Sequence, residues 1–344
     1  MQHEHPTRRR FLAACAALGL GALAVPLLPA ASAAARLAPG LVRVSRTQPL
    51  MGTFVSIIAV HESRAFAEEA VGRAFEAMHA DIAVFNRFDP ASPLSVLNDQ
   101  GVLKGAPREL LELLDESRNI HALTGGAFDP TVKPIIDCFR SRADQDGDFH
   151  LDRAERDELL ALVGLGGVRS TGDGVRFARA GMGLTLDGVA KGRVADRASE
   201  RLSAMGCANH LVNAGGDIRL ASDERLEAPW TVAIQAPEGG ESPSVIHLRN
   251  GAVATSGSYE IAFDRHRVHH HIVDPRTALS PGLCSSATVT AGTVMQADAL
   301  ATAAFVLPPR AGFELIDALP GAEALLITDN GTALPTRRWG FERS

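Results

Sequence analysis

The alternation of hydrophobic and polar positions predicts strands at the start of the body of the chain and again after residue 168. Residues 41–60 alternate and are rich in Val and Ile on either side of Met51-Gly52-Thr53, as expected for two strands joined by a turn. Residues 168–186 show a similar pattern around the turn Gly172-Asp173-Gly174. Further strand-like segments cover residues 210–220, 230–235, 245–249 and 252–255.

Apolar residues at intervals of three and four predict helices over residues 63–85, 110–123, 191–205 and 297–307. The last of these is apolar nearly all round and is expected to be buried. Strands and helices mix without strict alternation, and hairpin signals recur. The pattern therefore predicts an α+β fold with antiparallel sheets and packed helices rather than a doubly wound parallel sheet.

An acid-rich insert at residues 144–157 invites comparison with a calcium-binding loop. If Gly147 took the glycine position of such a loop, the first ligand position would fall on Arg142, which cannot bind calcium. A solvated loop that leads into a helix over residues 153–162 is therefore the favoured interpretation.

Residues 1–33 have the features of an export signal of the twin-arginine type. Thr7-Arg8-Arg9-Arg10-Phe11-Leu12 precedes an apolar stretch to Ala30, and Ala31-Ser32-Ala33 supplies the small residues of a cleavage site. The alternative is a membrane anchor, which Pro26 and Pro29 argue against. We expect a signal at 1–33, a single functional domain at 34–344 and a location in the periplasm.

The charge balance excludes one broad class of function and the composition another. The 344 residues carry a formal net charge of −6, and loss of residues 1–33 would remove three arginines and one glutamate and change that charge to −8. An acidic chain without basic runs argues against nucleic-acid binding, and a hydrophobic fraction of 46% argues against disorder. Cys138, Cys207 and Cys284 lack CxxC spacing, which indicates neither a disulfide framework nor a thiolate zinc site.

Two glycine-containing segments could contact a ligand. In Gly125-Gly126-Ala127-Phe128-Asp129 the glycines allow a ligand to approach the backbone and Phe128 offers a ring for stacking; the alternative is a helix end followed by a turn. Thr185-Leu186-Asp187-Gly188 leads into a helix that starts near Lys191, where free amides and an ammonium could bind an anion. The alternative there is an ordinary turn between a strand and a helix.

Asp298 and Thr302 lie one helical turn apart on an otherwise apolar helix, so their oxygens share one side. A charged carboxylate on such a helix needs a partner, and hard oxygen ligands of this kind suit magnesium. The alternative is that Asp298 caps the start of its helix. In His269-His270-His271, strand alternation would put His269 and His271 on one face, which makes zinc improbable and leaves one histidine as a proton acceptor.

In their order along the chain these segments resemble the ApbE family, the FAD:protein FMN transferases. No single motif is specific, but the ordered set is. The matching segments are Met51-Gly52-Thr53, Phe85-Asn86-Arg87-Phe88, residues 92–98, Gly126-Ala127-Phe128-Asp129-Pro130-Thr131, Gly188-Val189-Ala190-Lys191-Gly192 with Asp196, Asn213-Ala214-Gly215-Gly216-Asp217, Ala254-Thr255-Ser256-Gly257, residues 271–277, and Ala297-Asp298 with Ala301-Thr302.

The resemblance implies a magnesium-dependent enzyme with an ApbE-like, T-fold-related architecture and a flavin site in a cleft between two packed lobes. It would cleave the pyrophosphate of FAD, attach FMN through a phosphoester to a threonine of a partner protein, and release AMP. The implied metal ligands are Asp298, Thr302 and the backbone carbonyls of Gly188 and Ala301. The implied contacts of the flavin substrate are Met51, Phe88, Ala127, Phe128, Asp129, Thr185, Lys191 and Val273.

His271 is the candidate base for the incoming hydroxyl, with Asp274 as a weaker one. The expected partners are FAD and an acceptor protein that faces the periplasm, such as a membrane electron-transfer subunit. The twin-arginine signal is reminiscent of family members that serve nitrous oxide reductase maturation. Two alternatives stay open: an FAD pyrophosphatase, with water as the nucleophile, and a non-catalytic periplasmic flavin-binding protein.

Three positions depart from the usual family pattern. The family has Asp-Leu-Gly-Gly where this chain has Thr185-Leu186-Asp187-Gly188, so the carboxylate is shifted by two residues, which on a strand would keep its face and move it about 7 Å. Phe88 replaces a usual Tyr, and Ala278 replaces a usual Gly. The shift puts the role of position 185 in doubt.

Overall fold

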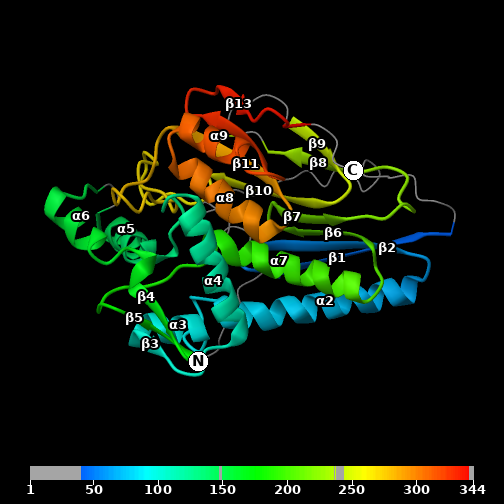
Figure 1. Ribbon diagram of the computed structural model, residues 1–344, viewed down its shortest axis with the longest axis horizontal. Helices are drawn as coiled ribbons and strands as arrows, with labels where there is room; N and C mark the ends of the chain where they lie inside the picture. The colour runs from blue at the N-terminus through cyan, green and yellow to red at the C-terminus, as the bar shows by residue number, and fades with distance from the viewer. Residues whose placement is uncertain (1–39, 147–148, 236, 238–243, 341–344) are drawn as a thin grey trace, which may run out of the picture.

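The centre of the fold is an eight-stranded sheet in which every pair of neighbouring strands is antiparallel (Figure 1). The structure is a computed structural model that describes residues 40–146, 149–235, 237 and 244–340. The predicted signal at residues 1–33 lies outside the described residues. In spatial order the strands are β1 (Val42–Leu50), β2 (Thr53–His61), β6 (Asn209–Ala214), β7 (Asp217–Ala221), β10 (Gly251–Gly257), β11 (Cys284–Ala291), β12 (Glu323–Thr328) and β13 (Ala333–Pro335).

Four helices cover one face of this sheet: α2 (Arg64–Phe85), α7 (Asp187–Ala204), α8 (Val294–Val306) and α9 (Pro309–Asp317) (Figure 1). The Ser63 side chain begins α2 by accepting a hydrogen bond from the Phe66 amide. As expected from its apolar sequence, α8 is buried almost all round, between α7, α9 and strands β10 and β11. The predicted α+β fold with packed helices is confirmed.

A small hairpin covers the opposite face of the large sheet. Its strands are β8 (Trp230–Ile234) and β9 (Ser244–Leu248). Their inward residues form an apolar cluster with Val60, Leu220 and Val253 of the sheet. Because both faces are covered, the alternating strands of the sheet have a buried side chain on each side at several positions.

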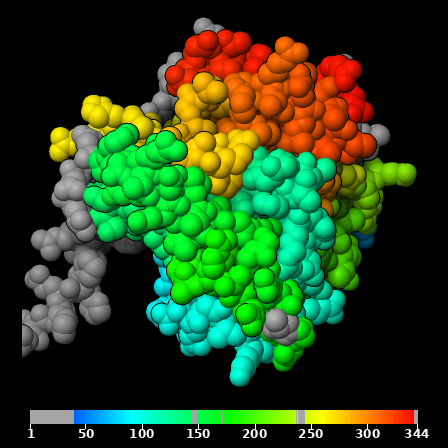
Figure 2. All heavy atoms as spheres, turned by 60° about the vertical axis from the view of Figure 1, so that its left-hand side comes forward, coloured from blue at the N-terminus to red at the C-terminus, as the bar shows by residue number. Residues whose placement is uncertain are grey.

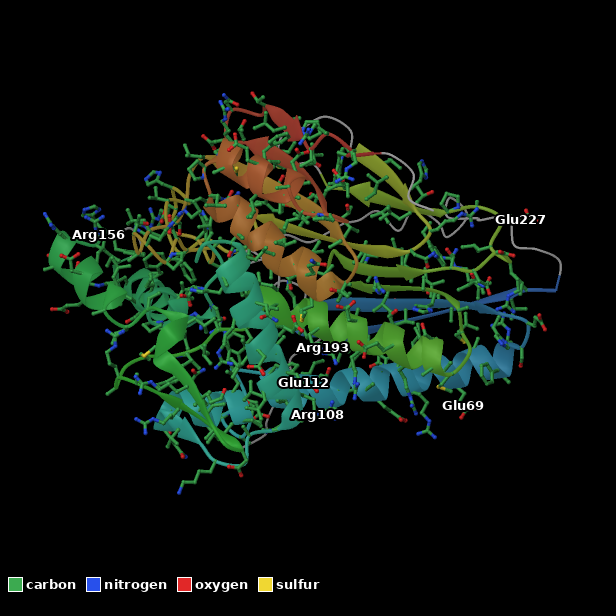
Figure 3. The ribbon with its side chains drawn as sticks, in the orientation of Figure 1. Glu69, Arg108, Glu112, Arg156, Arg193 and Glu227 are labelled. Carbon is green, nitrogen blue, oxygen red and sulfur yellow. The ribbon has the colours of Figure 1, made fainter. Side chains whose placement is uncertain are left out.

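The chain between α2 and α7 forms a smaller lobe on the left of Figure 1. Figure 3 shows Arg108 and Glu112 on the outer side of α4, where Arg108 Nε lies 2.6 Å from a carboxylate oxygen of Glu112. The lobe has a three-stranded sheet in the order β3-β5-β4. Its elements are α3 (Pro93–Gln100), β3 (Val102–Leu103), α4 (Arg108–Leu123), α5 (Lys133–Asp146), α6 (Arg153–Leu160), β4 (Val168–Thr171) and β5 (Gly174–Phe177), with single 3-10 turns at Pro130–Val132 and Leu165–Gly167.

The prediction that strand structure extends to residue 186 is wrong beyond Phe177. The Asn98 side chain donates to the carbonyl of Leu184 (2.9 Å) and accepts from its amide (2.7 Å). This segment therefore satisfies backbone groups with a side chain instead of a neighbouring strand. Likewise α7 begins at Asp187, four residues before the predicted start, and α5 extends into the acid-rich insert expected to be a loop.

No helix among the described residues is both long and apolar enough to cross a membrane.

Helices α7 and α8 approach closely at Gly192. A Cβ atom added to Gly192 would lie 2.6 Å from the Cα of Met295, a distance that ordinary packing does not allow. Asp196, one turn further along α7, accepts hydrogen bonds from the amides of Val294 (3.0 Å) and Met295 (2.9 Å) at the start of α8. Glycine and carboxylate together fix where α8 begins.

Replacement of Gly192 by Ala is expected to destabilise the fold by roughly 1–3 kcal/mol, because the added methyl group forces α7 and α8 apart. Urea unfolding followed by circular dichroism measures this change. Gly166→Ala is the matched control, since a Cβ there meets nothing within 4 Å. Equal stabilities of the two variants would contradict the close contact.

Candidate functional site

Three of the four residues implied as metal ligands meet where α7 and α8 cross. Thr302 follows Asp298 by one turn on α8, and a Cβ on Gly188 would lie 3.0 Å from the Thr302 hydroxyl oxygen. Asp298 is buried, and its Oδ2 accepts a hydrogen bond from the Gly192 amide (3.2 Å). Ala301 is fully buried in the same turn of α8. The close approach of the helices thus gathers a carboxylate, a hydroxyl and the backbone of Gly188.

The alternative role of Asp298 as a helix cap is wrong. The cap of α8 is Thr293, whose hydroxyl accepts from the Gln296 amide, and Asp196 satisfies two further amides. Asp298 lies within the helix, beyond the free amides of its first turn. Its carboxylate is therefore available for a partner other than its own helix.

Buried carboxyl groups gather around Asp298. Lys191 Nζ lies 3.0 Å from a carboxylate oxygen of Asp217, which is also buried. Burial and the neighbouring Asp217 raise the pKa of Asp298 well above its usual range, and Asp217 raises the pKa of Lys191. Two buried carboxylates share one ammonium, so the donor set fits an added cation.

Any cation at this position would depend on hydroxyl and carbonyl oxygens in addition to Asp298. Among the described residues, no three His, Cys, Asp or Glu side chains form a group that could hold a metal ion. A mixed set of one carboxylate, one hydroxyl and backbone oxygens consists of hard donors, which suit magnesium or calcium and not zinc.

The three histidines do not lie on a continuous strand, which corrects the expected alternation of faces. His269 stacks on Phe149, and His270 contacts the ring of Phe305 on α8. His271 instead faces the segment that follows β10: its ring Nδ1 lies 3.3 Å from the carbonyl oxygen of Ile261. Each histidine therefore has its own environment.

His271 is held as a neutral imidazole. Burial and the charge of Lys191 lower the pKa of His271 to about 4. A carbonyl oxygen can only accept, so the Ile261 contact assigns the ring proton to Nδ1. Nε2 then carries the free lone pair, and it lies 3.7 Å from a carboxylate oxygen of Glu260. A neutral ring with an accessible lone pair has the form that a general base requires.

Asp274, the second candidate base, has a different setting. Its two oxygens accept from Arg276 Nε and Nη2, each at 2.7 Å, and its amide donates to the Leu279 carbonyl. Ala278, which follows in this turn, has φ of +56°, which accounts for the usual family glycine there. The carboxylate of Asp274 thus holds the 274–279 turn, and the structure does not bring it together with His271.

Several implied flavin contacts are internal to the smaller lobe. Gly125 and Gly126, both with positive φ, end α4 and lead into Ala127 and Phe128, which are buried. Asp129 accepts from the Thr131 amide (2.8 Å) and hydroxyl (2.5 Å). The helix end predicted as an alternative therefore exists. Phe128 nevertheless reaches the other lobe, because its ring lies 3.7 Å from a Cβ built on Gly188.

The shifted carboxylate Asp187 connects the lobes. Asp187 is the first residue of α7 and not part of a strand. The expectation that its side chain points to the same face of a strand as position 185 therefore does not apply. Asp187 Oδ2 accepts from Arg87 Nη2 at 2.7 Å, and the Arg87 guanidinium carbon lies 4.2 Å from the ring centre of Phe88. Phe88 is 67% exposed. Thr185 is buried, and its hydroxyl accepts from the Asp187 amide.

Two implied flavin contacts remain. Met51, with φ of +53°, forms the β1–β2 turn; the adjacent Thr53 packs against Gly215 in the turn before Asp217. This turn therefore lies at the end of the sheet where Lys191 is held. Val273 is buried in the cluster around Phe139. The cleft position of the flavin stays a prediction.

Reasoning from sequence missed Asp217, Glu260 and Arg87 as components of the site. Asp217 stood within a recognised motif, Asn213 to Asp217, which was a usable signal. Arg87 also stood within a recognised motif, Phe85-Asn86-Arg87-Phe88. Glu260 carried no local signal, since a single charged residue in a loop is usually solvated. A cavity of about 300 Å³ that Lys133, Asp137 and Arg179 help to line belongs to the smaller lobe and touches none of the predicted residues.

Known proteins share the sequence family and the fold of this chain. The model of the ApbE family matches residues 51–326. The FAD:protein FMN transferase of Treponema pallidum is 32% identical over 312 residues, which cover 82% of this chain and 84% of that protein. A crystal structure of the ApbE protein from Thermotoga maritima has a TM-score of 0.80 at 28% identity and covers 88% of this chain and 100% of its own.

The flavin transferase ApbE of Vibrio cholerae, at 24% identity and a TM-score of 0.73, supports the fold; it covers 86% of this chain and 98% of its own. The family match extends over well more than half of the chain and includes both lobes. The chain belongs to the ApbE family.

Proposed function

We propose that this protein is an FAD:protein FMN transferase that moves the FMN half of FAD to a threonine of a partner protein and releases AMP. The observation that carries this proposal is the meeting of Asp298, Thr302 and Gly188 beside Lys191, with His271 in its neutral form. Its relative in Treponema pallidum has this activity by name.

The proposed metal is magnesium, held by Asp298, Thr302 and the carbonyls of Gly188 and Ala301. When bound, it would neutralise charge on the pyrophosphate oxygens. The support is the excess of buried carboxylate over ammonium and the approach of Gly188 to the Thr302 hydroxyl. Thr293 and Asp196 already accept hydrogen bonds from the amides at the start of α8. The Asp298 carboxylate can therefore bind a metal without leaving an amide of α8 unpaired.

Lys191 would interact with the pyrophosphate as a fixed cation. Asp217 holds its ammonium group, and this contact stabilises the charged form. A positioned ammonium offsets the repulsion between an acidic protein and an anionic substrate. The side chain is about one-third exposed, so a substrate has access to it.

The transfer step balances with the groups present. The threonine oxygen forms a bond to the phosphorus of the FMN half, and the bond from that phosphorus to the bridging oxygen breaks. The bridging oxygen leaves with its electron pair as part of AMP. The threonine proton moves to Nε2 of His271 and then to solvent. Positioning and charge neutralisation supply most of the rate in such reactions.

The assay that tests this function incubates the purified protein with FAD, magnesium and the acceptor protein of the Vibrio cholerae transferase, alongside a variant of that acceptor whose threonine is Ala. Covalent flavin fluorescence on the acceptor in a denaturing gel supports transfer. AMP and free FMN without labelling would instead indicate an FAD pyrophosphatase. Retention of FAD with neither product would indicate a flavin-binding protein.

We further propose export by the twin-arginine route and an acceptor that faces the periplasm, in the manner of family members that serve nitrous oxide reductase maturation. The support is the Arg8-Arg9-Arg10 segment and the apolar stretch that follows. Residues 1–33 fused to a fluorescent protein are expected to direct it to the periplasm. The same fusion with these three arginines replaced by Lys should stay in the cytoplasm, and unchanged export of that variant would reject this route.

A further inference from the structure

Glu260 stands beside the one nitrogen of His271 that has a free lone pair. It lies three residues after β10 and its carboxylate oxygen is 3.7 Å from Nε2. The next residue, Ile261, accepts from both the amide (3.1 Å) and Nδ1 (3.3 Å) of His271. One short segment thus fixes the orientation of the imidazole and presents a negative charge to its reactive side. Figure 2 shows the gold segment that follows β10 on the surface between the orange helices and the green helices of the smaller lobe.

The charges that face His271 do not favour an imidazolium. Burial and Lys191 both oppose protonation of the ring, while Asp187 favours it. Asp187, however, is already paired with Arg87 at 2.7 Å, and Asp274 with Arg276. The Glu260 carboxylate lies 3.7 Å from His271 Nε2, and its side chain is 39% exposed, at the edge of the site. Burial raises the pKa of Glu260, and the charge of Lys191 lowers it. Glu260 is the carboxylate placed to respond to charge on the ring.

We propose that Glu260 is a positioning residue that stabilises the imidazolium formed on His271 when it takes the acceptor proton. This inference rests on the proposed transfer function. The proton passes from the threonine oxygen to Nε2, the ring becomes positive opposite the Glu260 carboxylate, and the proton then leaves to solvent. Because opposite charges at this separation attract, the carboxylate makes His271 a stronger base than burial and Lys191 alone would allow.

The test compares Glu260→Gln, which keeps the shape and removes the charge, with Glu260→Asp, which keeps the charge. Transfer of FMN to the Vibrio cholerae acceptor is expected to fall roughly tenfold or more in Glu260→Gln, with the KM for FAD unchanged. Glu260→Asp should retain most of the rate. Glu69→Gln is the matched control, because Glu69 is exposed on α2 at the opposite side of the molecule from this segment (Figure 3).

The pH profile separates an electrostatic role from a structural one. Burial raises the pKa of Glu260, so this carboxyl titrates in the same acidic range as His271, and the acidic limb of kcat/KM in the unaltered protein belongs to the pair. Glu260→Gln leaves His271 to titrate alone, so the limb should move to lower pH and become less steep. A merely structural defect would lower the rate without moving this limb. Glu260, Lys191 and Asp187 are the charged groups that face His271, and only the first is changed.

A double-variant cycle tests whether Glu260 acts through His271. Glu260→Gln should have little further effect when His271 is already Ala, because no imidazolium forms. An undiminished effect of Glu260→Gln in the His271→Ala background would overturn the inference. So would a Glu260→Gln variant that has the wild-type rate and the wild-type acidic limb of kcat/KM. Absence of transfer by the unaltered protein is a different result, since it would reject the proposed function itself.

Discussion

Replacement of Asp298 by Asn is expected to lower FMN transfer by at least roughly a hundredfold, because the variant loses the only carboxylate among the proposed magnesium ligands. The fold should persist, since Asn has the same shape and the buried carboxylate is costly to ionise, as its raised pKa shows. In-gel flavin fluorescence measures transfer. Thermal unfolding with and without magnesium gives an independent reading: the metal should raise the Tm of the unaltered protein and leave that of Asp298→Asn unchanged.

Asp81→Asn is the matched control for this experiment. Asp81 is another buried aspartate, on α2, whose pKa is also raised by burial. Its replacement should leave transfer and the magnesium effect intact while any change in stability resembles that of Asp298→Asn. Full transfer by Asp298→Asn would reject the metal assignment, and loss of transfer in both variants would point to a general structural defect.

Replacement of His271 by Ala is expected to lower the transfer rate by roughly 10²–10⁴-fold while FAD still binds, because the acceptor hydroxyl loses its proton acceptor. In the unaltered protein the neutral ring is present above its pKa of about 4. Transfer should therefore persist well below pH 6.5, the ordinary value for histidine, and fall only toward that lower pKa. Rate measurements across pH and an FAD titration followed by flavin fluorescence test both statements.

Added imidazole provides a sharper reading of the same variant. A free base that enters the space left by the ring should restore part of the rate in His271→Ala and none in Asp298→Asn. His247→Ala, at an exposed histidine of β9, serves as the control and should transfer normally. Weakened FAD binding with an unchanged rate would assign His271 to the substrate instead of to the proton.

Local patterns predicted most secondary structure because each depends on neighbours in the chain. The turn at Met51-Gly52, the helix after Ser63 and the buried helix around Asp298 all lie where the periodicity indicated. The strand prediction for residues 178–186 is wrong for a specific reason. Its apolar residues are buried as in a strand, but Asn98, more than eighty positions away, provides the backbone partners.

The residues of the site fall into two groups, those placed together by their spacing along the chain and those placed together by packing. Asp298 and Thr302 share a helix, so their common side followed from spacing alone. The pairs Lys191 with Asp217, Arg87 with Asp187, and Glu260 with His271 join separate elements. Several of these side chains stand in recognised motifs, but no local pattern indicates which of them pair. The capping role considered for Asp298 belongs to Thr293 with Asp196.

By itself the sequence indicated many of the elements, the α+β class and, through the ordered motifs, the resemblance to the ApbE family. Only the tertiary structure decided which charges face one another. The crossing of α7 and α8 at Gly192 sets Asp298 against the Gly192 amide and Thr302 against Gly188, and the chain after β10 brings Glu260 to His271. The physical reason is that secondary structure depends on contacts a few residues apart, whereas electrostatic pairing depends on distances in space, which packing alone establishes.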